Sequence, residues 1–292
     1  MLQPEIRETV ENFLRTSRDP DLKWLGEENI GCGSVNAAWR VRTSAGDFFL
    51  KCNDTFNLPG LFEAESRGLR RLRDTETLRV PQVHLQTTVG ENTFLLMEYV
   101  PARDEGDGFF ADFGRRLARM HRNTWKAFGL DHCNYISSIR QSNAPRGDWA
   151  PFFIEERLAP LLKSAFDADL LPQNVLKKFD ELFRRIPSLI PEEQPALLHG
   201  DLWYGNFIRH GGEAVLIDPA IYYGYREVDL AMTKLFGGFH PDFYAAYREE
   251  YPLAENWEER VGLWNLYPLL VHVMLFGGEY VPQLLETLDR YC

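Results

Sequence analysis

The sequence predicts an α+β protein of two lobes, with a small antiparallel β lobe at the N-terminus and a larger, mainly helical lobe after it. In the first hundred residues, strand-like segments alternate with segments of helical period. Residues 101–108 (PARDEGDG) have no apolar period and are rich in glycine and acid, which is typical of a linker. Helical periods dominate beyond it. The predicted division is therefore residues 1–100, a hinge at 101–108, and residues 109–292.

The first lobe is predicted from periodicity and turn residues. Residues 4–16 carry apolar side chains at helical spacing behind a proline that suits the first turn of a helix. Residues 25–52 divide into strand-like pieces around the turn SAGD. Helical spacing returns over 61–73, and the segment 80–100 predicts two strands joined around a glycine.

The second lobe is predicted in the same way. Its first helices fall at 109–125, 150–166 and 174–186. Two short strands, 206–210 and 214–219, are joined by a Gly-Gly pair and predict a hairpin. The last seventy residues are predicted to be helical and contain no internal repeat.

The composition argues against several classes of protein. The chain has 292 residues, 45% of them apolar, and its 32 lysines and arginines against 43 aspartates and glutamates give a net charge of −11. That balance disfavours a sequence-independent grip on nucleic acid, and no run reaches the ~18 apolar residues of a membrane span. The N-terminus does not resemble a signal peptide, so we expect a cytoplasmic protein without nucleic-acid or membrane partners. The four cysteines form no CxxC pair, which predicts reduced thiols and no structural zinc.

The most informative stretch is LLHGDLWYGNFIRHGGEAVLIDPA at 197–220. Its spacing is that of kinases, with His-Gly-Asp in place of His-Arg-Asp and Ile-Asp-Pro in place of Asp-Phe-Gly. It predicts Asp201 as the catalytic carboxylate that accepts or orients the proton of an attacking hydroxyl. Asn206 and Asp218 are predicted as oxygen ligands of Mg²⁺ on the triphosphate of ATP. His199 is expected to brace the loop by hydrogen bonds, and the alternative for each polar residue is a solvated place in a surface loop.

The first lobe should then hold the nucleotide. A glycine loop follows the first strand, and its backbone N–H groups could reach phosphate oxygens, although an asparagine replaces the third glycine of G-x-G-x-x-G. Lys51 ends the apolar run FFLK and is predicted to bind phosphate, with Glu65 as its ion partner and Glu63 as a competitor for that role. The alternative for each charge is a solvated surface group. The candidate residues of the loop are Gly31, Gly33, Ser34, Val35 and Asn36.

The apolar strand LLMEYV at 95–100 leaves the first lobe toward the hinge. The backbone C=O near Glu98 and the N–H near Val100 are predicted to pair with the edge of adenine. The side chains of this segment, including Tyr99, would be incidental to that contact.

Long phrases of the sequence resemble those of the fructosamine and ketosamine kinases. These kinases belong with aminoglycoside phosphotransferases and choline kinases in the protein-kinase-like fold. The phrases are GSVNAAW, AGDFFLK, FEAE, IRQSN with DWAPFFIEERL, LLHGDLWYGN, IDPAIYYGYREVDLAMTKLFGGF and FGGEY, and they cover most of the chain. The resemblance implies an ATP- and Mg²⁺-dependent kinase that phosphorylates a sugar hydroxyl, the 3-hydroxyl, of ketosamines. Such acceptors are ribulosamine or fructosamine adducts of amines or protein lysines, and the context is deglycation repair.

The resemblance also implies roles for single residues. Trp203 would stack on the face of the sugar, which suits a flat indole, and the alternative is a buried aromatic. Many relatives have the loop cysteine at the position of Ser34, whereas this chain has Cys32, so redox control through that loop cannot simply be transferred. The family phrases also contain residues without a predicted chemical role, namely Gln141, Asn143, Asp148 and Trp149.

Three other functions stay open at the level of sequence. The first is an aminoglycoside-type or choline-type small-molecule kinase, which the acceptor would distinguish. The second is a non-catalytic nucleotide-binding regulator, against which the intact set of Lys51, Asp201, Asn206 and Asp218 argues. The third is a metal hydrolase using Asp201, Asp218 and Asp229, which would leave the glycine loop unused.

Overall fold

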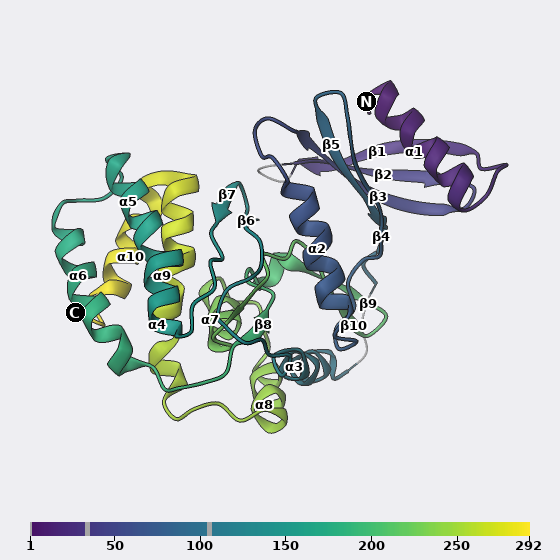
Figure 1. Cartoon of the computed structure of the whole chain (residues 1–292). Coiled ribbons are helices and arrows are strands. Elements are labelled where there is room, and N and C mark those ends of the chain that lie inside the picture. Colours follow the sequence, from purple (N-terminus) through teal and green to yellow (C-terminus); the bar gives the residue numbers. More distant parts are fainter. Residues whose placement is uncertain (1, 33–35, 104–106) are drawn as a thin grey trace. The chain divides into compact units, whose positions relative to one another are not determined.

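The structure, a computed structural model, describes residues 2–32, 36–103 and 107–292 and divides the chain into two compact units (Figure 1). Unit 1 is Met1–Glu105 with Ile208–Ile217, and unit 2 is Gly106–Phe207 with Asp218–Cys292. The hairpin after the kinase-like motif therefore groups with the N-terminal unit, although it lies inside the predicted second lobe. The functional division at 101–108 stays a prediction.

Unit 1 is built on a five-stranded antiparallel sheet with the strand order β1-β2-β3-β5-β4. The predicted helices and strands of this region are confirmed, and the helix predicted at 61–73 has those bounds. The elements are α1 (Pro4–Ser17), β1 (Trp24–Cys32), β2 (Ala37–Thr43), β3 (Gly46–Asp54), α2 (Leu61–Arg73), β4 (Val83–Val89) and β5 (Asn92–Glu98), with the hairpin of β9 (Phe207–His210) and β10 (Glu213–Leu216).

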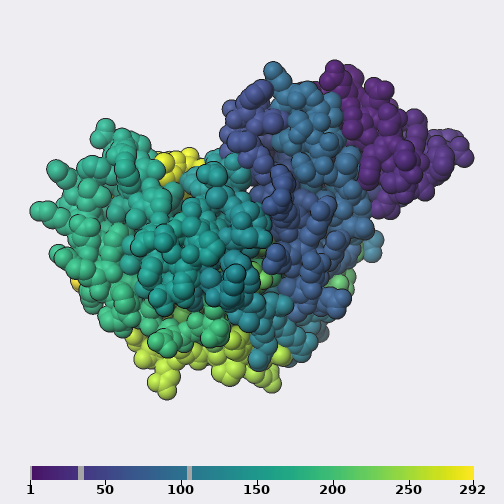
Figure 2. Space-filling model, viewed as in Figure 1, coloured from purple at the N-terminus to yellow at the C-terminus, as the bar shows by residue number. Residues whose placement is uncertain are grey.

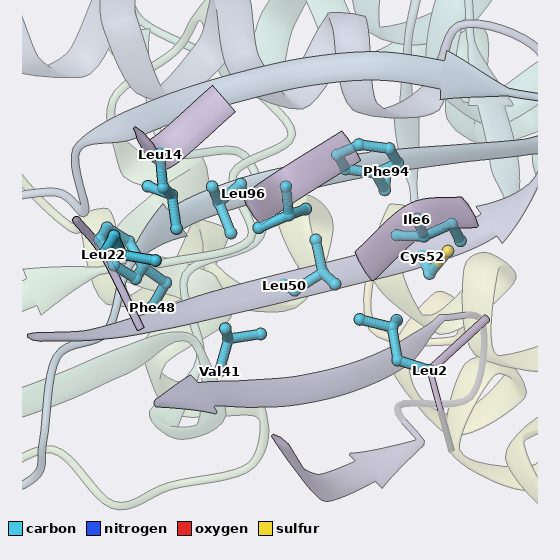
Figure 3. Packing of buried hydrophobic residues seen from close by; sticks show 11 residues of the cluster. Leu2, Ile6, Leu14, Leu22, Val41, Phe48, Leu50, Cys52, Phe94 and Leu96 are labelled. Carbon is cyan, nitrogen blue, oxygen red and sulfur yellow. The ribbon is translucent and has the colours of Figure 1, made fainter. Parts of the chain in front are cut away.

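Helix α1 covers one face of this sheet. Its apolar residues at helical spacing meet side chains that the neighbouring strands β2, β3 and β5 point toward it (Figure 3). On β3 these inward residues are Phe48, Leu50 and Cys52. The space-filling view shows α1, in purple, on the outside of the unit (Figure 2). Because side chains alternate along a strand, Lys51 projects from the opposite face, away from this apolar cluster.

Unit 2 is mainly helical, and its described residues also form two short antiparallel ladders, β6–β7 and β8–β11. Helix α9 contacts α5, α7 and α10, and Figure 1 shows α5, α9 and α10 side by side. The elements are α3 (Phe109–Met120), β6 (Asn134–Ile136), β7 (Ile139–Gln141), α4 (Trp149–Phe152), η1 (Phe153–Leu158), α5 (Ala159–Asp167), α6 (Asn174–Leu189), β8 (Ala196–Leu198), η2 (Tyr204–Asn206), β11 (Tyr222–Gly224), α7 (Glu227–Leu235), α8 (Pro241–Glu250), α9 (Trp257–Phe276), η3 (Gly277–Tyr280) and α10 (Val281–Leu288).

Two of the predicted helices need correction. The helix predicted at 109–125 ends at Met120, because the carbonyl of Asn123 accepts a hydrogen bond from the N–H of Leu197 at 2.9 Å and draws this segment toward β8. The helix predicted at 150–166 is interrupted by a π-helical turn, η1. The hydrophobic pattern of the sequence does not reveal the π-helical turn, because one wider turn barely alters the spacing of the apolar residues.

The stretch from helix α9 through α10 contradicts the expectation that no segment is apolar enough to cross a membrane. Within the part of the chain that the structure describes, the helical stretch Trp257–Leu288 reaches that length and composition. However, 56% of its most apolar part is buried inside the protein, and Leu263, Trp264 and Leu266 have no exposed surface. The core position of α9 accounts for its apolar composition.

Candidate active site

The kinase-like motif is held between two short strands. β8 and β11 pair antiparallel, with Leu198 opposite Tyr222, so the segment from 199 to 221 begins and ends at the same place. The N–H of Ala220 donates to the carbonyl of His199 at 2.9 Å and closes the base of the loop. Gly200 lies here with φ +82°, and a Cβ at this position would stand 2.1 Å from the carbonyl oxygen of Ala220. Glycine is therefore required in His-Gly-Asp both by the backbone conformation and by this close approach.

Asp201 and Asn206 meet directly. The Nδ2 group of Asn206 donates to the backbone carbonyl of Asp201 at 2.8 Å and to its Oδ2 at 2.9 Å. Both amide protons are thereby used. Among the described residues, no hydrogen-bond donor contacts Oδ1 of Asn206, so this oxygen stays available as a ligand.

The charge environment of Asp201 is unusual for a carboxylate. Burial, with the neighbouring charges of Asp218 and Asp229, raises its pKa to about 7, and the hydrogen bond from Asn206 lowers it only in part. Asp218 follows β10 with φ +54°, a conformation that costs energy for any residue with a Cβ. The negative charges of Asp218 and Asp229 thus act on Asp201 and disfavour its ionised form.

Asp229 has a role that the sequence did not reveal. It has no exposed surface, and its two carboxylate oxygens accept the backbone N–H groups of His199 at 2.7 Å and of Gly200 at 2.9 Å. Its Oδ2 also lies 3.2 Å from Nε2 of His121, whose Nδ1 lies 2.8 Å from the hydroxyl of Tyr247. Asp229 therefore holds the catalytic loop by its backbone, and its oxygens are committed to these donors.

His199 is buried in the same loop. Its Nδ1 accepts the backbone N–H of Asp201 at 3.3 Å, and this contact braces the loop as predicted. Local sequence gives no signal for the contacts of Asp229, because this residue lies 30 positions after His199 and 108 positions after His121.

Trp203 lies on the surface of unit 2. It is 38% exposed, so the alternative of a buried aromatic is wrong. Its ring packs across Gly205, where a Cβ would stand 2.3 Å from the indole. The ring also contacts Phe236, at a centroid distance of 6.1 Å. The indole is therefore fixed in place beside the loop that carries Asp201.

Three of the four residues without a predicted role make structural contacts. Gln141 and Asn143 are buried and both donate to Oδ1 of Asn134 at 2.9 Å, while Asn134 donates to the carbonyl of Ile221 at 2.6 Å. This chain of amides supports the segment that closes the catalytic loop. Trp149 is also buried, and its ring stacks with those of Phe152 and Phe153.

In unit 1 the structure brings Lys51 and Glu65 together. Nζ of Lys51 lies 2.8 Å from Oε1 of Glu65, and the two side chains are only 8% and 9% exposed. The competing carboxylate, Glu63, instead pairs with Arg67 one turn along the exposed face of α2. Helix α2 and strand β3 thus form a buried ion pair, Lys51–Glu65, on the face of the sheet opposite α1.

The glycine loop is described only at its ends. The N–H of Gly31 donates to the side chain of Asn29 at 3.1 Å, and Oδ1 of Asn36 accepts from Asn53 at 2.6 Å. The predicted contacts Gly33, Ser34 and Val35 lie outside the described residues.

The predicted adenine contact begins at the last residue of β5, a strand that pairs with β3 on one side and with β4 on the other. The N–H of Glu98 donates to the carbonyl of Gln82 at 2.8 Å, and its carboxylate pairs with Arg79. Tyr99 lies beneath the guanidinium of Arg40 at 4.6 Å, and Val100 is buried. The side chains here are thus committed to local contacts, and any adenine contact would be made by the backbone.

The oxygen ligands available at this site suit Mg²⁺ better than they suit a metal ion held by protein side chains alone. In residues 2–32, 36–103 and 107–292, no group of three or more His, Cys, Asp or Glu side chains could enclose a metal ion. Asp229, which a metal hydrolase would need, has its oxygens occupied by N–H donors. Asp218 and Asn206 offer two hard oxygens, and Mg²⁺ commonly takes one or two protein ligands with phosphates and waters completing its shell.

Together, an antiparallel sheet carrying a buried Lys–Glu pair and a helical unit carrying the His-Gly-Asp loop define a phosphotransferase of the protein-kinase-like fold. Comparison with known proteins gives the particular group: the fructosamine kinase family matches residues 6–292. The chain belongs to the fructosamine kinase family and is an ATP-dependent phosphotransferase.

Individual relatives cover nearly the whole chain. The "Probable ketoamine kinase" of Enterococcus faecium is 36% identical over 264 residues, which are 89% of this chain and 92% of that protein. The chloroplastic protein-ribulosamine 3-kinase of Arabidopsis thaliana is 36% identical over 94% of this chain and 88% of its own length.

Solved structures confirm the fold class. A Thermobifida fusca crystal structure assigned to fructosamine-3-kinase has a TM-score of 0.85 at 35% identity, covering 92% of this chain and 94% of that one. The aminoglycoside phosphotransferase APH(4)-Ia has a TM-score of 0.64 at 14% identity, covering 98% of this chain and 99% of that one. The second likeness shows the fold alone.

Proposed function

We propose that the chain transfers the terminal phosphoryl group of ATP to the 3-hydroxyl of a ketosamine, a sugar bound through its first carbon to an amine. The acceptor would be a ribulosamine or fructosamine adduct of a small amine or a protein lysine, which suits a role in deglycation. The observation that carries the proposal is the Asp201–Asn206 pair on a loop fixed by Asp229, within a chain of the fructosamine kinase family.

Asp201 is proposed as the group that takes or orients the proton of the attacking hydroxyl. Its raised pKa supports this role, since a carboxylate that titrates near neutral pH accepts a proton more readily than an ordinary one. Asn206 fixes the rotamer of Asp201 through Nδ2, and Asp229 fixes the backbone on which Asp201 stands. Trp203 would hold the sugar by its exposed indole face.

Asp218 and Oδ1 of Asn206 are proposed as the protein ligands of Mg²⁺. When bound, the ion would neutralise phosphate charge and polarise the transferring group. Lys51, oriented by Glu65, is proposed to bind phosphate oxygens. The glycine loop, represented by Gly31, Gly33, Ser34, Val35 and Asn36, is proposed to offer backbone N–H groups, and the backbone of Glu98, Tyr99 and Val100 to contact adenine.

The test is ATP turnover against a panel of acceptors. Ribulose-, erythrulose- and fructose-amines of one common amine are compared with kanamycin and choline at equal concentration, and ADP release and phosphorylated product are both measured. We expect stoichiometric product with at least one ketosamine and none with the two controls. Product with kanamycin or choline alone would contradict the proposal, as would ADP release without any phosphorylated acceptor.

A further inference from the structure

A continuous set of aromatic rings extends from the catalytic loop across unit 2. The ring of Trp203 contacts Phe236, which follows α7, at 6.1 Å between centroids, and Phe236 contacts His272 of α9 at 4.9 Å. His272 in turn contacts Phe276 at 5.5 Å and Tyr280 of η3 at 4.8 Å. We name these five residues the aromatic strip. Three separate segments of the chain thus build one surface that begins two positions after Asp201.

The aromatic strip collects the exposed apolar surface of its unit. Trp203, Phe236 and Phe276 are 38%, 41% and 51% exposed. In the part of unit 2 that the structure describes, the only other large hydrophobic side chain of comparable exposure is Tyr204, the direct neighbour of Trp203. Exposed aromatics gathered at one place, rather than scattered singly over a surface, indicate a binding site.

His272 gives the aromatic strip a defined polar atom. Its Nδ1 lies 2.7 Å from the carbonyl oxygen of Pro268, and because a carbonyl can only accept, Nδ1 carries the proton. Burial lowers the pKa of His272, so the ring is neutral at pH 7. Nε2 then has a lone pair, and among the described residues it has no hydrogen-bond partner.

The chemistry of the aromatic strip indicates which kind of ligand it can bind. Flat aromatic faces bind aliphatic C–H groups and, through the quadrupole of the ring, cations. A neutral imidazole does not repel a cation, and its Nε2 can accept a hydrogen bond from an ammonium N–H. The amine half of a ketosamine has both parts, a protonated nitrogen next to the sugar and, in a lysine adduct, an aliphatic chain.

We propose that the aromatic strip binds the amine-bearing half of the acceptor, with the sugar at Trp203 and the alkyl chain along Phe236, His272, Phe276 and Tyr280. This inference rests on the proposed function and extends it. The enzyme would then discriminate acceptors by the chain that carries the sugar, favouring adducts with an extended alkyl amine over those with a minimal one.

The experiment compares two acceptors with the same sugar. One is the ribulose adduct of methylamine, and the other is the ribulose adduct of the side chain of an N-acetyl-lysine amide. The variants are Phe236→Ala and Phe276→Ala, and Phe56→Ala in unit 1, which is 74% exposed and outside the aromatic strip, is the matched control. KM is measured for both acceptors and for ATP, with thermal unfolding as the check on folding.

We expect each strip variant to raise KM for the lysine adduct about 3- to 10-fold, the range for losing one aromatic contact. KM for the methylamine adduct and for ATP should stay within about twofold, and Phe56→Ala should change none of the three. Equal changes for both acceptors would overturn the inference. So would a dimer that Phe276→Ala converts to a monomer, because the strip would then bind a second copy of the chain.

The outcomes distinguish a failure of the proposed function from a failure of the inference about the aromatic strip. If the unmodified enzyme phosphorylates neither adduct, the proposed function is wrong and this inference falls with it. If it phosphorylates both adducts with KM values that the strip variants leave unchanged, the proposed function stands and the inference alone is overturned.

Discussion

The carboxylate of Asp229 lies 2.7 Å from the backbone nitrogen of His199, 30 residues earlier in the chain, and accepts its hydrogen bond in a fully buried setting. Its other oxygen accepts from Gly200 at 2.9 Å. Two consecutive N–H groups directed at one carboxylate fix the orientation of two peptide planes. Asp229, on helix α7, thus sets the orientation of the backbone that carries Asp201.

Asp229→Asn should lower kcat while leaving KM for ATP nearly unchanged. The amide presents N–H₂ to a backbone N–H, so one hydrogen bond is lost and the loop shifts. A small misplacement of a catalytic group can cost up to about 100-fold in rate. Asp242→Asn, at an exposed carboxylate of α8, is the control and should keep kcat within about twofold. Unchanged kcat in a folded Asp229→Asn protein would contradict the positioning role.

Gly200→Ala should be far more destabilising than Gly211→Ala. Both glycines have positive φ, +82° and +60°, so both substitutions carry a backbone cost of about 1–2 kcal/mol. Only at Gly200 does the new Cβ meet an atom, the carbonyl oxygen of Ala220 at 2.1 Å, while nothing lies within 4 Å at Gly211. Urea unfolding measures both variants. Equal losses in the free energy of unfolding would contradict the close approach of Gly200 to the carbonyl oxygen of Ala220.

Glu65→Gln and Glu63→Gln separate the two carboxylates that the sequence left as competitors. Glu65→Gln removes the charge opposite buried Lys51, so we expect a several-fold higher KM for ATP and a loss of about 1–3 kcal/mol in the free energy of unfolding. Glu63→Gln breaks only an exposed pair with Arg67, worth about 0.5 kcal/mol. The same KM for both variants would refute the assignment of Glu65.

The sequence predicted those parts of the molecule that are continuous in the chain. Helix α2 (Leu61–Arg73) has an uninterrupted helical period, and the catalytic pattern lies within 24 consecutive residues, 197–220. The strands β8 and β11 are three residues long, too short for an alternating pattern, and they form because distant segments pair. The contacts of Asp229 with the loop and with His121 likewise depend on tertiary structure, so no local signal announces them.

Asp201→Asn should raise thermal stability, and the gain should depend on pH. In the free protein the pKa of Asp201 is about 7, above the unfolded value of about 3.9. Its ionisation therefore favours unfolding increasingly from about pH 4 to pH 7 and levels off above that. Without nucleotide or metal, the variant should exceed the wild type in Tm by more at pH 8 than at pH 5. A difference in Tm that is the same at both pH values would contradict the raised pKa.

The most direct test of the account compares Asp201→Asn with Asp218→Ala, each by ketosamine turnover and by titration calorimetry with Mg·ATP. Asp201 is assigned to the acceptor hydroxyl, so its variant should lose about 10²–10⁴-fold in turnover and bind Mg·ATP as the wild type does. Asp218 is assigned to the metal, so its variant should lose both turnover and Mg²⁺-dependent nucleotide affinity. Turnover by Asp201→Asn within a fewfold of wild type, or unchanged Mg·ATP affinity in Asp218→Ala, would contradict the assignment of the site.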